Sequence, residues 1–516
     1  MNLLRRLRLL FALASGLLLA LAYPPYNVPG AEWFAPAALL FVALQARPWV
    51  AMLCGFLHGV AFYAVTLPWI YSVMRVHGGV GPAVAGGLLG LLVLYLSLFP
   101  ALFGWGVAFL SRQGAARGLL AAPALWVALE FARTHVPILG FPWNLLGYAV
   151  ADRLLLLQVV SITGIYGLSF VLLGYNALLA WLLVTRTRTP WLAWLLCTGL
   201  VLPIALLGER VVPSRIPREE AMLVQTNFPQ APEYPANWMD LHAAEMDELE
   251  RISIEAVRQD PSSSPEKNLV IWPEVPAPFY FLDPKFAARA ERVARESGAH
   301  FLVGVVEWRP GPDNRLQPYN SAVLLDPAGQ RKFQYDKIHL VPFGEYVPLR
   351  RVLKFAESLV AEVGDYQPGS AYAVGQLPGG KFGAFICFEA IFPDEVRRFT
   401  AHGAELLINI TNDGWYGRSA APEQHLAIAR VRAVENRRWL LRATNNGYTV
   451  AIDPYGREVA RLAPDIRGVL RAPYSFRSDR TVYSRFGDWF AVACVIVSVG
   501  FLAVTILKVK RMEERK

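Results

Sequence analysis

Cysteine is scarce in this sequence and is placed where it cannot build a disulfide framework. Only four cysteines occur in 516 residues, and Cys54, Cys197 and Cys494 lie inside apolar runs. Cys387 is the one cysteine between residues 215 and 485. This polar region therefore cannot form an internal disulfide, and a disulfide-rich scaffold is excluded. The lack of a cysteine pair also argues against a structural zinc site.

Charged side chains are nearly missing from the first 210 residues. This half carries twelve basic residues, all of them arginine, and four acidic ones, whereas the whole chain has 50 basic and 41 acidic residues. The net charge of +9 divides into +8 before residue 211, −2 in the middle and +3 in residues 508–516. Because the excess positive charge lies among apolar segments, the pattern indicates membrane topology and not a nucleic-acid-binding surface.

The apolar runs of this half are long enough to cross a bilayer, which takes about 20 mostly apolar residues. We predict a membrane domain of seven helices over residues 1–210, a C-terminal transmembrane helix at 488–507 and a basic cytoplasmic tail at 508–516. Arginines precede the first run, but no small-residue cleavage site follows it, so we expect an uncleaved anchor. The predicted spans cover residues 8–23, 32–46, 50–73, 80–110, 118–132, 154–184, 190–207 and 488–507.

The positive-inside rule gives this arrangement an orientation. With the N-terminus in the cytoplasm, the inside segments carry 13 arginines and lysines and the short outside loops carry 3. Seven spans then place the polar region outside the cytoplasm. Glu130 leaves two interpretations open. It is either a functional ionisable group at membrane depth, or it lies beyond an earlier helix end and pairs with Arg133 at the interface.

The polar region, residues 215–485, alternates short runs of valine, isoleucine and leucine with helical patterns. Turn signals such as Asp326–Gly329 and Asp453–Gly456 separate pairs of strand-like runs. Together these patterns predict one α/β domain with a layered sheet. Strands are expected at 221–226, 268–272, 301–306, 321–325, 382–388, 405–411 and 448–452, and helices at 236–258, 284–297 and 422–438.

Common catalytic and metal-binding motifs do not occur in the sequence. There is no P-loop, no His-Glu-x-x-His and no Gly-x-Ser-x-Gly. The eight histidines show no paired spacing typical of metal ligands. We therefore predict no metal site and no cofactor.

Three residues of suitable chemistry stand out at strand ends instead. Glu274 ends the run from Asn268, where poor solvation of a carboxylate suits a general base. Lys337 lies in an apolar, proline-rich stretch, where a fixed ammonium can stabilise an oxyanion. Cys387 ends a strand, where active sites of α/β sheets tend to lie, and supplies a nucleophile. Together the three suit acyl transfer through a thioester.

Each of these residues also has an ordinary interpretation. Glu274 can be a surface residue in a turn, and Lys337 can form a surface ion pair with Glu345. Cys387 can be an inert buried thiol, which is common in proteins. Sequence spacing alone does not bring the three together in space.

The order Glu, Lys, Cys at strand ends resembles the nitrilase superfamily of carbon–nitrogen hydrolases. Longer strings resemble the apolipoprotein N-acyltransferase family within it, and the likeness covers nearly the whole chain. The strings are Gln225–Gln230, Lys337–Pro348, Thr411–Gly417, Glu423–His425 and Arg442–Gly447.

This resemblance implies an αββα sandwich at residues 215–485, on the periplasmic side of a bacterial inner membrane. It implies Glu274 as general base, Lys337 as oxyanion stabiliser and Cys387 as nucleophile. Glu345 and Glu389 become supporting carboxylates that orient Lys337 or tune the base. Positions that match substrate-facing or flexible segments of the family are Trp238, Trp415, Glu423 and Phe388, the last of which replaces a tyrosine found in many members.

The resemblance also implies a reaction and its partners. An acyl chain passes from the sn-1 position of a phospholipid, phosphatidylethanolamine by family likeness, to the N-terminal amine of a diacylated apolipoprotein. The enzyme is expected to act as a monomer without a cofactor or nucleic acid. Two alternatives stay open: a membrane-anchored amidase or nitrilase that hydrolyses a small C–N substrate, and a transporter or scaffold with an inactive polar domain.

Overall fold

The structure is a computed structural model that describes residues 2–185, 191–199, 210–214, 216–230, 234–259, 268–311, 314–346 and 365–514. The chain forms two compact units. The first unit comprises Met1–Tyr71, Pro82–Val212 and Phe486–Lys516, and the second comprises Ser72–Gly81 and Pro213–Arg485. The second unit therefore includes a short segment from the apolar half of the sequence.

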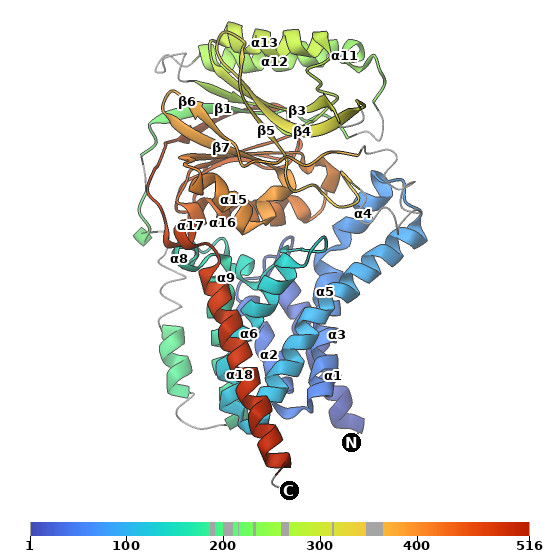
Figure 1. Cartoon of the computed structure of the whole chain (residues 1–516), viewed down its shortest axis with the longest axis vertical. Coiled ribbons are helices and arrows are strands. Elements are labelled where there is room, and N and C mark those ends of the chain that lie inside the picture. The colour runs from blue at the N-terminus through green and yellow to red at the C-terminus, as the bar shows by residue number, and fades with distance from the viewer. Residues whose placement is uncertain are drawn as a thin grey trace. The chain divides into compact units, whose positions relative to one another are not determined.

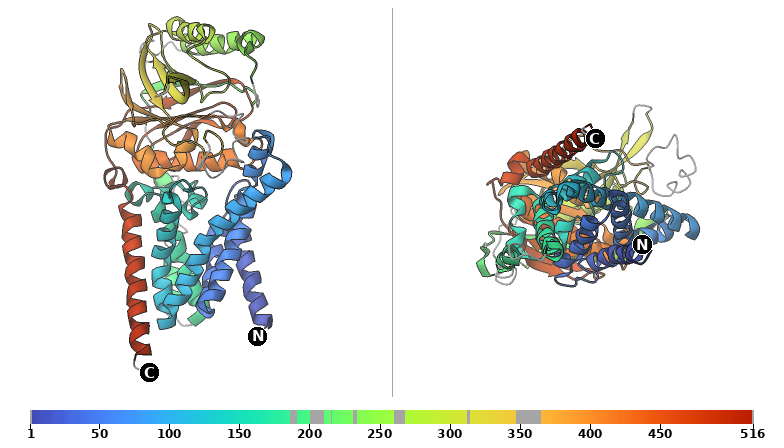
Figure 2. Two further views of the ribbon diagram at one scale, coloured as in Figure 1. Left: turned by 45° about the vertical axis from the view of Figure 1, so that its right-hand side comes forward. Right: turned by 90° about the horizontal axis from the view of Figure 1, so that it is seen from below.

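The first unit consists of apolar helices that run side by side (Figure 2). Helix α18, from the far end of the chain, packs against α6, and α1 begins at the same end of the unit at which α18 ends (Figures 1 and 2). The helices are α1 (Asn2–Ala20), α2 (Ala31–Gln45), α3 (Pro48–Thr66), α5 (Pro82–Leu110), α6 (Ala115–His135), α7 (Leu154–Leu157), α8 (Val160–Thr163), α9 (Ile165–Thr185) and α18 (Trp489–Glu513). Helix α4 (Pro68–Val76) begins in this unit and belongs to the second unit from Ser72 onward.

Within the described residues, five helical stretches are long and apolar enough to cross a membrane. This finding agrees with the prediction of a membrane domain, although eight spans were expected. Helix α1 carries three arginines near its start, and α2 has only 15 residues. The expected span at 190–207 lies partly outside the described residues. The five stretches are Pro48–Thr66, Pro82–Gln113, Ala115–His135, Ile165–Thr185 and Trp489–Glu513.

Two predicted spans are interrupted. The span expected at 50–73 breaks at Leu67, between α3 and α4. The span expected at 154–184 divides into α7, α8 and α9, and Gly164 adopts φ 67° at the last break. Apolar composition does not reveal such breaks, because a bent segment and a straight helix bury the same residue types.

Helix α6 continues to His135, so Glu130 does not lie beyond its end. The Glu130 side chain is buried, and its Oε1 accepts hydrogen bonds from Trp126 Nε1 at 2.9 Å and from the Leu146 backbone N–H at 2.7 Å. Arg133 donates to the Tyr63 hydroxyl. The interpretation that the helix ends before Glu130 is therefore wrong. The Glu130 carboxylate holds the Leu146 segment against α6.

The second unit contains two six-stranded sheets packed face to face, with α12 and α13 over one sheet and α15 and α16 over the other (Figure 1). In each sheet three neighbouring strands are parallel and the outer strands are antiparallel. This architecture confirms the expected αββα sandwich. One sheet has the order β12-β1-β2-β3-β4-β5 and the other β11-β10-β9-β8-β7-β6.

The predicted strands all occur, but the four strands at the sheet edges and one inner strand, Leu440–Thr444, were missed. The edge strands are short or carry polar side chains on a partly exposed face, so their apolar alternation is weak. The inner strand is fully buried, but Arg442 interrupts its short apolar run. The strands are β1 (Glu219–Gln225), β2 (Leu269–Ile271), β3 (His300–Pro310), β4 (Leu316–Leu325), β5 (Arg331–Asp336), β6 (Val374–Leu377), β7 (Gly380–Ile386), β8 (Leu406–Thr411), β9 (Leu440–Thr444), β10 (Thr449–Ile452), β11 (Glu458–Leu462) and β12 (Gly468–Tyr474).

The helices of this unit follow local signals in the sequence. Asp283 caps α13 by accepting from the Lys285 N–H at 2.9 Å, Pro284 occupies the first turn, and Gly298 ends the helix at φ 67°. The helix expected at 236–258 is interrupted at His242. The helices are α11 (Trp238–Leu241), α12 (Ala243–Arg258), α13 (Pro284–Ser297), α15 (Pro393–Ala401), α16 (Ala421–Asn436) and α17 (Val482–Phe486).

An aromatic core lies between the first sheet and helices α12 and α13. Trp272, directly after β2, is fully buried against Phe279 and Phe301, and its Nε1 donates to Ser253 Oγ at 3.0 Å. This packing holds the end of β2 in place. Glu274 follows two residues later, so the core fixes the backbone from which that carboxylate projects.

Candidate active site

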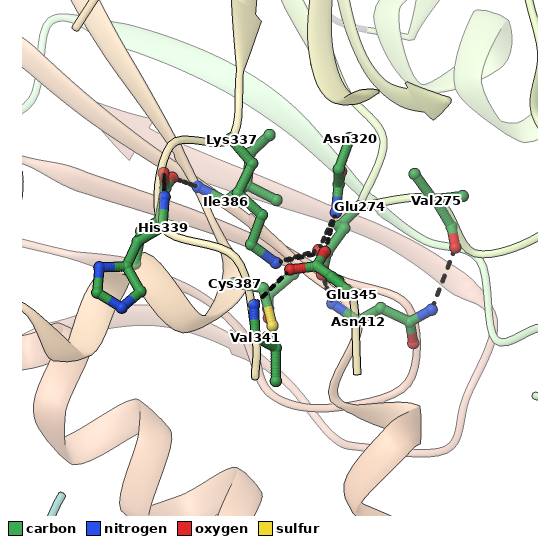
Figure 3. Close-up of polar contacts among 12 residues, drawn as sticks. Glu274, Val275, Asn320, Lys337, His339, Val341, Glu345, Ile386, Cys387 and Asn412 are labelled. Carbon is green, nitrogen blue, oxygen red and sulfur yellow. Dashed lines mark hydrogen bonds and ion pairs between the residues drawn. The ribbon is translucent and has the colours of Figure 1, made fainter. Parts of the chain in front are cut away.

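Glu274 is almost fully buried and is surrounded by hydrogen-bond donors (Figure 3). Its Oε1 accepts from Lys337 Nζ at 3.0 Å and from Asn320 Nδ2 at 2.8 Å. Its Oε2 accepts from the backbone N–H of Asn412 at 2.9 Å. These donors occupy both oxygens of the carboxylate and fix its position beside Lys337.

Lys337 follows β5, is 1% exposed, and lies between two carboxylates. Its Nζ is 3.0 Å from Glu274 Oε1 and 2.9 Å from Glu345 Oε1. Burial alone favours the neutral amine, but the two carboxylates outweigh it and raise the pKa of Lys337 well above its usual value. The ammonium is therefore permanent near neutral pH.

Cys387 follows β7 and opens a short 3₁₀ helix, η5 (Cys387–Ile391). Its φ of 49° lies in the left-handed region, which costs a residue with a side chain about 1–3 kcal/mol. Figure 3 shows its sulfur beside the Lys337 amino group and the carboxylates of Glu274 and Glu345. The sharp turn at the strand end therefore presents the thiol to the charged groups.

The resting form of Cys387 is a neutral thiol. Burial and then the negative charge of Glu274 raise the pKa of the Cys387 thiol far above its usual value, although Lys337 opposes this. A thiolate here would be a second negative group buried beside the Glu274 carboxylate. For the sulfur to attack a substrate, the thiol must therefore pass its proton to a neighbouring base in the same step.

Glu345 is a direct partner of Lys337. Its Oε1 also accepts from Asn320 Nδ2 at 2.8 Å, and its Oε2 accepts from the Val341 N–H at 2.8 Å. Asn320 therefore bridges Glu345 and Glu274. The carboxylate of Glu345 fixes both the position and the charge of Lys337.

Glu389 is fully buried but forms no hydrogen bond with the Lys337 side chain in the described structure. Its Oε1 accepts from the backbone N–H of Ile338 at 2.7 Å, directly after Lys337. Its Oε2 accepts from the N–H of Ile386 at 2.7 Å, directly before Cys387. Burial, followed by the charge of Glu395, raises the pKa of Glu389 to about 7. Glu389 thus joins the Lys337 segment to the turn at Cys387.

The site draws on both sheets. Glu274 and Lys337 follow β2 and β5 of one sheet, whereas Cys387 and Asn412 follow β7 and β8 of the other. Packing of the two sheets therefore assembles the three groups, which no single strand or motif brings together.

The other expected site residues lie around this centre. Phe388 directly follows Cys387, is buried, and packs against Phe392 with ring centroids 5.5 Å apart. Trp415, in η6 (Asp413–Tyr416), meets the ring of His77 at 5.2 Å. Glu423, in the first turn of α16, accepts from the Tyr448 hydroxyl at 3.2 Å.

Trp238 belongs to the aromatic core of the second unit. It is buried, stacks on His242 at 4.4 Å, and meets Phe228 at 5.2 Å. Within the described structure, Trp238, Phe388, Trp415 and Glu423 have no hydrogen bond or ion pair with Glu274, Lys337 or Cys387.

Sequence reasoning missed Asn320 entirely and did not single out Asn412 within its motif. Asn320 lies on β4 and is 5% exposed. Asparagine is depleted from strands, so its position beside a buried run was the available signal. Among the described residues, no group of three or more His, Cys, Asp or Glu side chains is arranged to hold a metal ion.

Two family models match this chain, one in its apolar half and one in its polar half. Residues 15–178 match the model of the apolipoprotein N-acyltransferase N-terminal domain. Residues 225–476 match the carbon-nitrogen hydrolase model. Both matches agree with the resemblance seen in the sequence.

Curated relatives align along nearly the full chain. The apolipoprotein N-acyltransferase of Geobacter metallireducens is 39% identical, covering 94% of this chain and 93% of the relative. That of Methylococcus capsulatus is 34% identical, covering 95% of each. Among solved structures, an amidase from Nesterenkonia sp. AN1 is 20% identical, covers 52% of this chain and 96% of its own, and has a TM-score of 0.37.

Gly304 on β3 leaves no room for a side chain next to Glu274. A Cβ there would lie 2.4 Å from the Pro273 carbonyl oxygen and 2.6 Å from Glu274 Cα. We expect Gly304→Ala to displace Glu274 and slow acylation of Cys387 about 10²-fold, the loss typical of a ~1 Å misplacement. Intact-mass measurement of the acyl adduct over time checks this rate.

The matched control is Gly468→Ala, on β12 of the same sheet. A Cβ there meets only Leu462 Cδ2, at an ordinary 3.7 Å. This variant should acylate at the wild-type rate. Equal rates for Gly304→Ala and Gly468→Ala would show that the position of Glu274 does not limit the reaction.

The raised pKa of Cys387 predicts an unusual pH profile for its alkylation. A raised pKa means that thiolate forms only at higher pH, so the rate with iodoacetamide should keep rising above pH ~8.5, the midpoint of a free thiol. Glu274→Gln removes a charge that raises this pKa, so its profile should shift to lower pH. Peptide mapping of Cys387, with glutathione as reference, measures both. A shift to higher pH in Glu274→Gln contradicts the charge assignment.

The core placement of Trp238 predicts a stability effect. We expect Trp238→Ala to destabilise the protein by about 3–5 kcal/mol, as truncation of a buried tryptophan does. Thermal unfolding in detergent measures the drop in midpoint. Slower acylation with an unchanged midpoint would instead assign Trp238 to substrate contact.

Proposed function

The chain belongs to the apolipoprotein N-acyltransferase family, and from this premise we propose that it transfers an acyl chain from a phospholipid to the N-terminal amine of a diacylated apolipoprotein. The observation that carries the proposal is the buried Lys337 ammonium, held between Glu274 and Glu345 beside the Cys387 thiol. This arrangement supplies a base, an oxyanion partner and a nucleophile within one closed site.

The first half-reaction forms an acyl-enzyme. Glu274 takes the thiol proton as the sulfur of Cys387 attacks the sn-1 ester carbonyl of the phospholipid, for which phosphatidylethanolamine is the proposed donor. The Lys337 ammonium and a backbone N–H stabilise the oxyanion. The carbon–oxygen bond then breaks, Glu274 returns the proton to the leaving oxygen, and lysophospholipid departs. Cys387 keeps the acyl chain as a thioester.

The second half-reaction forms the amide. The acceptor is an apolipoprotein whose N-terminal cysteine already carries diacylglycerol, and its α-amine has a free pKa near 8, so part of it is neutral at pH 7. The amine nitrogen attacks the thioester carbonyl while Glu274 takes its proton. The carbon–sulfur bond breaks, and the sulfur regains the proton from Glu274. The product is a triacylated lipoprotein, and atoms balance without a cofactor.

The charge of the site suits both steps. Lys337 stays protonated because two carboxylates face it, so it cannot compete with Glu274 as the base. The neutral resting thiol gives little thiolate before substrate arrives. Burial of Cys387, which is 5% exposed, also supports keeping water from the thioester, as a transferase requires.

The membrane unit supports a location and an orientation. We place the enzyme in the bacterial inner membrane with its catalytic unit on the periplasmic side, because the charge count favours cytoplasmic ends for both termini. The common end at which α1 begins and α18 ends supports this (Figure 2). Both substrates carry long acyl chains, and exposing each CH₂ to water costs about 0.8 kcal/mol. The triad comes from one chain, which supports action as a monomer.

The test is to trap the acyl-enzyme. Purified protein in detergent receives phospholipid labelled in its sn-1 chain, and intact mass with peptide mapping locates the label. We expect a hydroxylamine-labile adduct on Cys387 that disappears when a diacylglyceryl peptide is added and yields the N-acylated peptide.

Cys387→Ala is the control and should carry no adduct. Hydrolysis of a small amide that requires Cys387, without an adduct from phospholipid, would establish the amidase alternative. Folded protein that does neither would show the triad to be structural.

A further inference from the structure

His425 contacts the backbone of the nucleophile. It lies on α16, is fully buried, and its Nε2 is 3.1 Å from the carbonyl oxygen of Cys387. A carbonyl can only accept a hydrogen bond. The hydrogen therefore sits on Nε2, and His425 donates it to Cys387.

A buried ion pair holds the other side of this ring. His425 Nδ1 lies 3.0 Å from Asp413 Oδ1 and 3.1 Å from Arg442 Nη2. Arg442 donates to Asp413 Oδ2 at 2.8 Å, and all three side chains have no exposure. Burial raises the pKa of Asp413, but Arg442 and His425 outweigh it and lower that pKa to about 2. Asp413 therefore stays ionised beside Arg442, and the two side chains fix the imidazole.

The bond from His425 sets the orientation of one peptide plane. A trans peptide directs its C=O and N–H to opposite sides, so the Cys387 carbonyl and the Phe388 N–H point apart. Helix α16, with His425, covers the outer face of the sheet that contains β7 (Figure 1). The Phe388 N–H therefore points inward, to the side from which Lys337 approaches.

The Phe388 N–H is also available to a ligand by its place in the chain. It is the second N–H of η5 (Cys387–Ile391), and the first N–H groups of a helix have no acceptor within that helix. Backbone N–H groups directed at the developing charge are the usual donors of an oxyanion hole.

We propose that His425 is a positioning residue that aims the Phe388 N–H at the acyl oxyanion, opposite the Lys337 ammonium. The inference rests on the proposed acyl transfer through Cys387. In this arrangement the Lys337 ammonium supplies the positive charge of the oxyanion site. The Phe388 N–H supplies a hydrogen bond of fixed direction. The Asp413–Arg442 pair acts only by holding the ring.

The test separates oxyanion formation from nucleophile reactivity. Alkylation of Cys387 by iodoacetamide displaces iodide at a saturated carbon and forms no oxyanion, whereas acylation by phospholipid requires one. We expect His425→Leu to lower the rate of acylation about 10²-fold, within the range for loss of one oxyanion donor, and to leave alkylation at a fixed pH within about twofold.

His425→Gln keeps a donor on a side chain of similar reach and should recover most of the acylation rate. His402→Gln, at an exposed histidine after α15, is the matched control and should behave as wild type in both assays. Thermal unfolding of each variant measures whether it folds. If His425→Leu does not fold, both assays are run on His425→Asn instead. Its shorter amide does not reach the Cys387 carbonyl, so the expected result is the same.

Parallel loss of alkylation and acylation in His425→Leu would overturn the proposal, because it indicates damage to the thiol or to Glu274. Wild-type acylation in that variant would overturn it as well. Failure of the proposed function is distinct: the wild-type protein itself would then form no adduct with phospholipid, while its alkylation would still proceed.

Discussion

The buried ammonium of Lys337 is the interaction on which the active site depends. Burying one charge is costly unless it is paired, and here Glu274 and Glu345 flank it at 3.0 and 2.9 Å. Asn320 bridges the two carboxylates, so removal of any one member leaves the others buried without compensation. The Glu274 carboxylate of this cluster also disfavours a thiolate at Cys387, so the proposed nucleophile rests as a thiol. The same buried charged groups therefore stabilise the site and keep the Cys387 thiol unreactive.

The strained turn at Cys387 depends on contacts from several directions. A left-handed residue persists only where its surroundings determine it. Glu389 holds the N–H of Ile386 on one side, and His425 holds the Cys387 carbonyl on the other. Glu389 also accepts from the backbone after Lys337, so one carboxylate links the segments that carry the proposed nucleophile and the proposed oxyanion partner. The two sheets thus place groups for which the proposed reaction needs sub-ångström accuracy.

Membrane attachment and burial of Cys387 both serve to keep the reacting groups away from water. The acyl chains of the proposed substrates are too apolar to pass through water, and the proposed thioester is too reactive to be left in it. In the first unit, apolar helices provide the membrane attachment that the acyl chains require. In the second unit, nearly complete burial of Cys387 keeps water from the proposed thioester. The charge asymmetry of the sequence belongs to the first unit alone, which is why the high net charge carries no information about the site.

The sequence by itself determined the division into an apolar and a polar half, most of the core strands, and the candidates Glu274, Lys337 and Cys387. These follow from composition, period-two runs and strand-end chemistry, all of which are local. The tertiary structure decided the breaks at Leu67 and Gly164, the edge strands and the inner strand β9, and the bonds of Asn320, Glu389 and His425. These bonds join residues from different strands, loops and a helix, so they depend on how the elements pack and on backbone direction at a turn. Neither leaves a periodic signal in the chain, so only the folded structure brings these groups together.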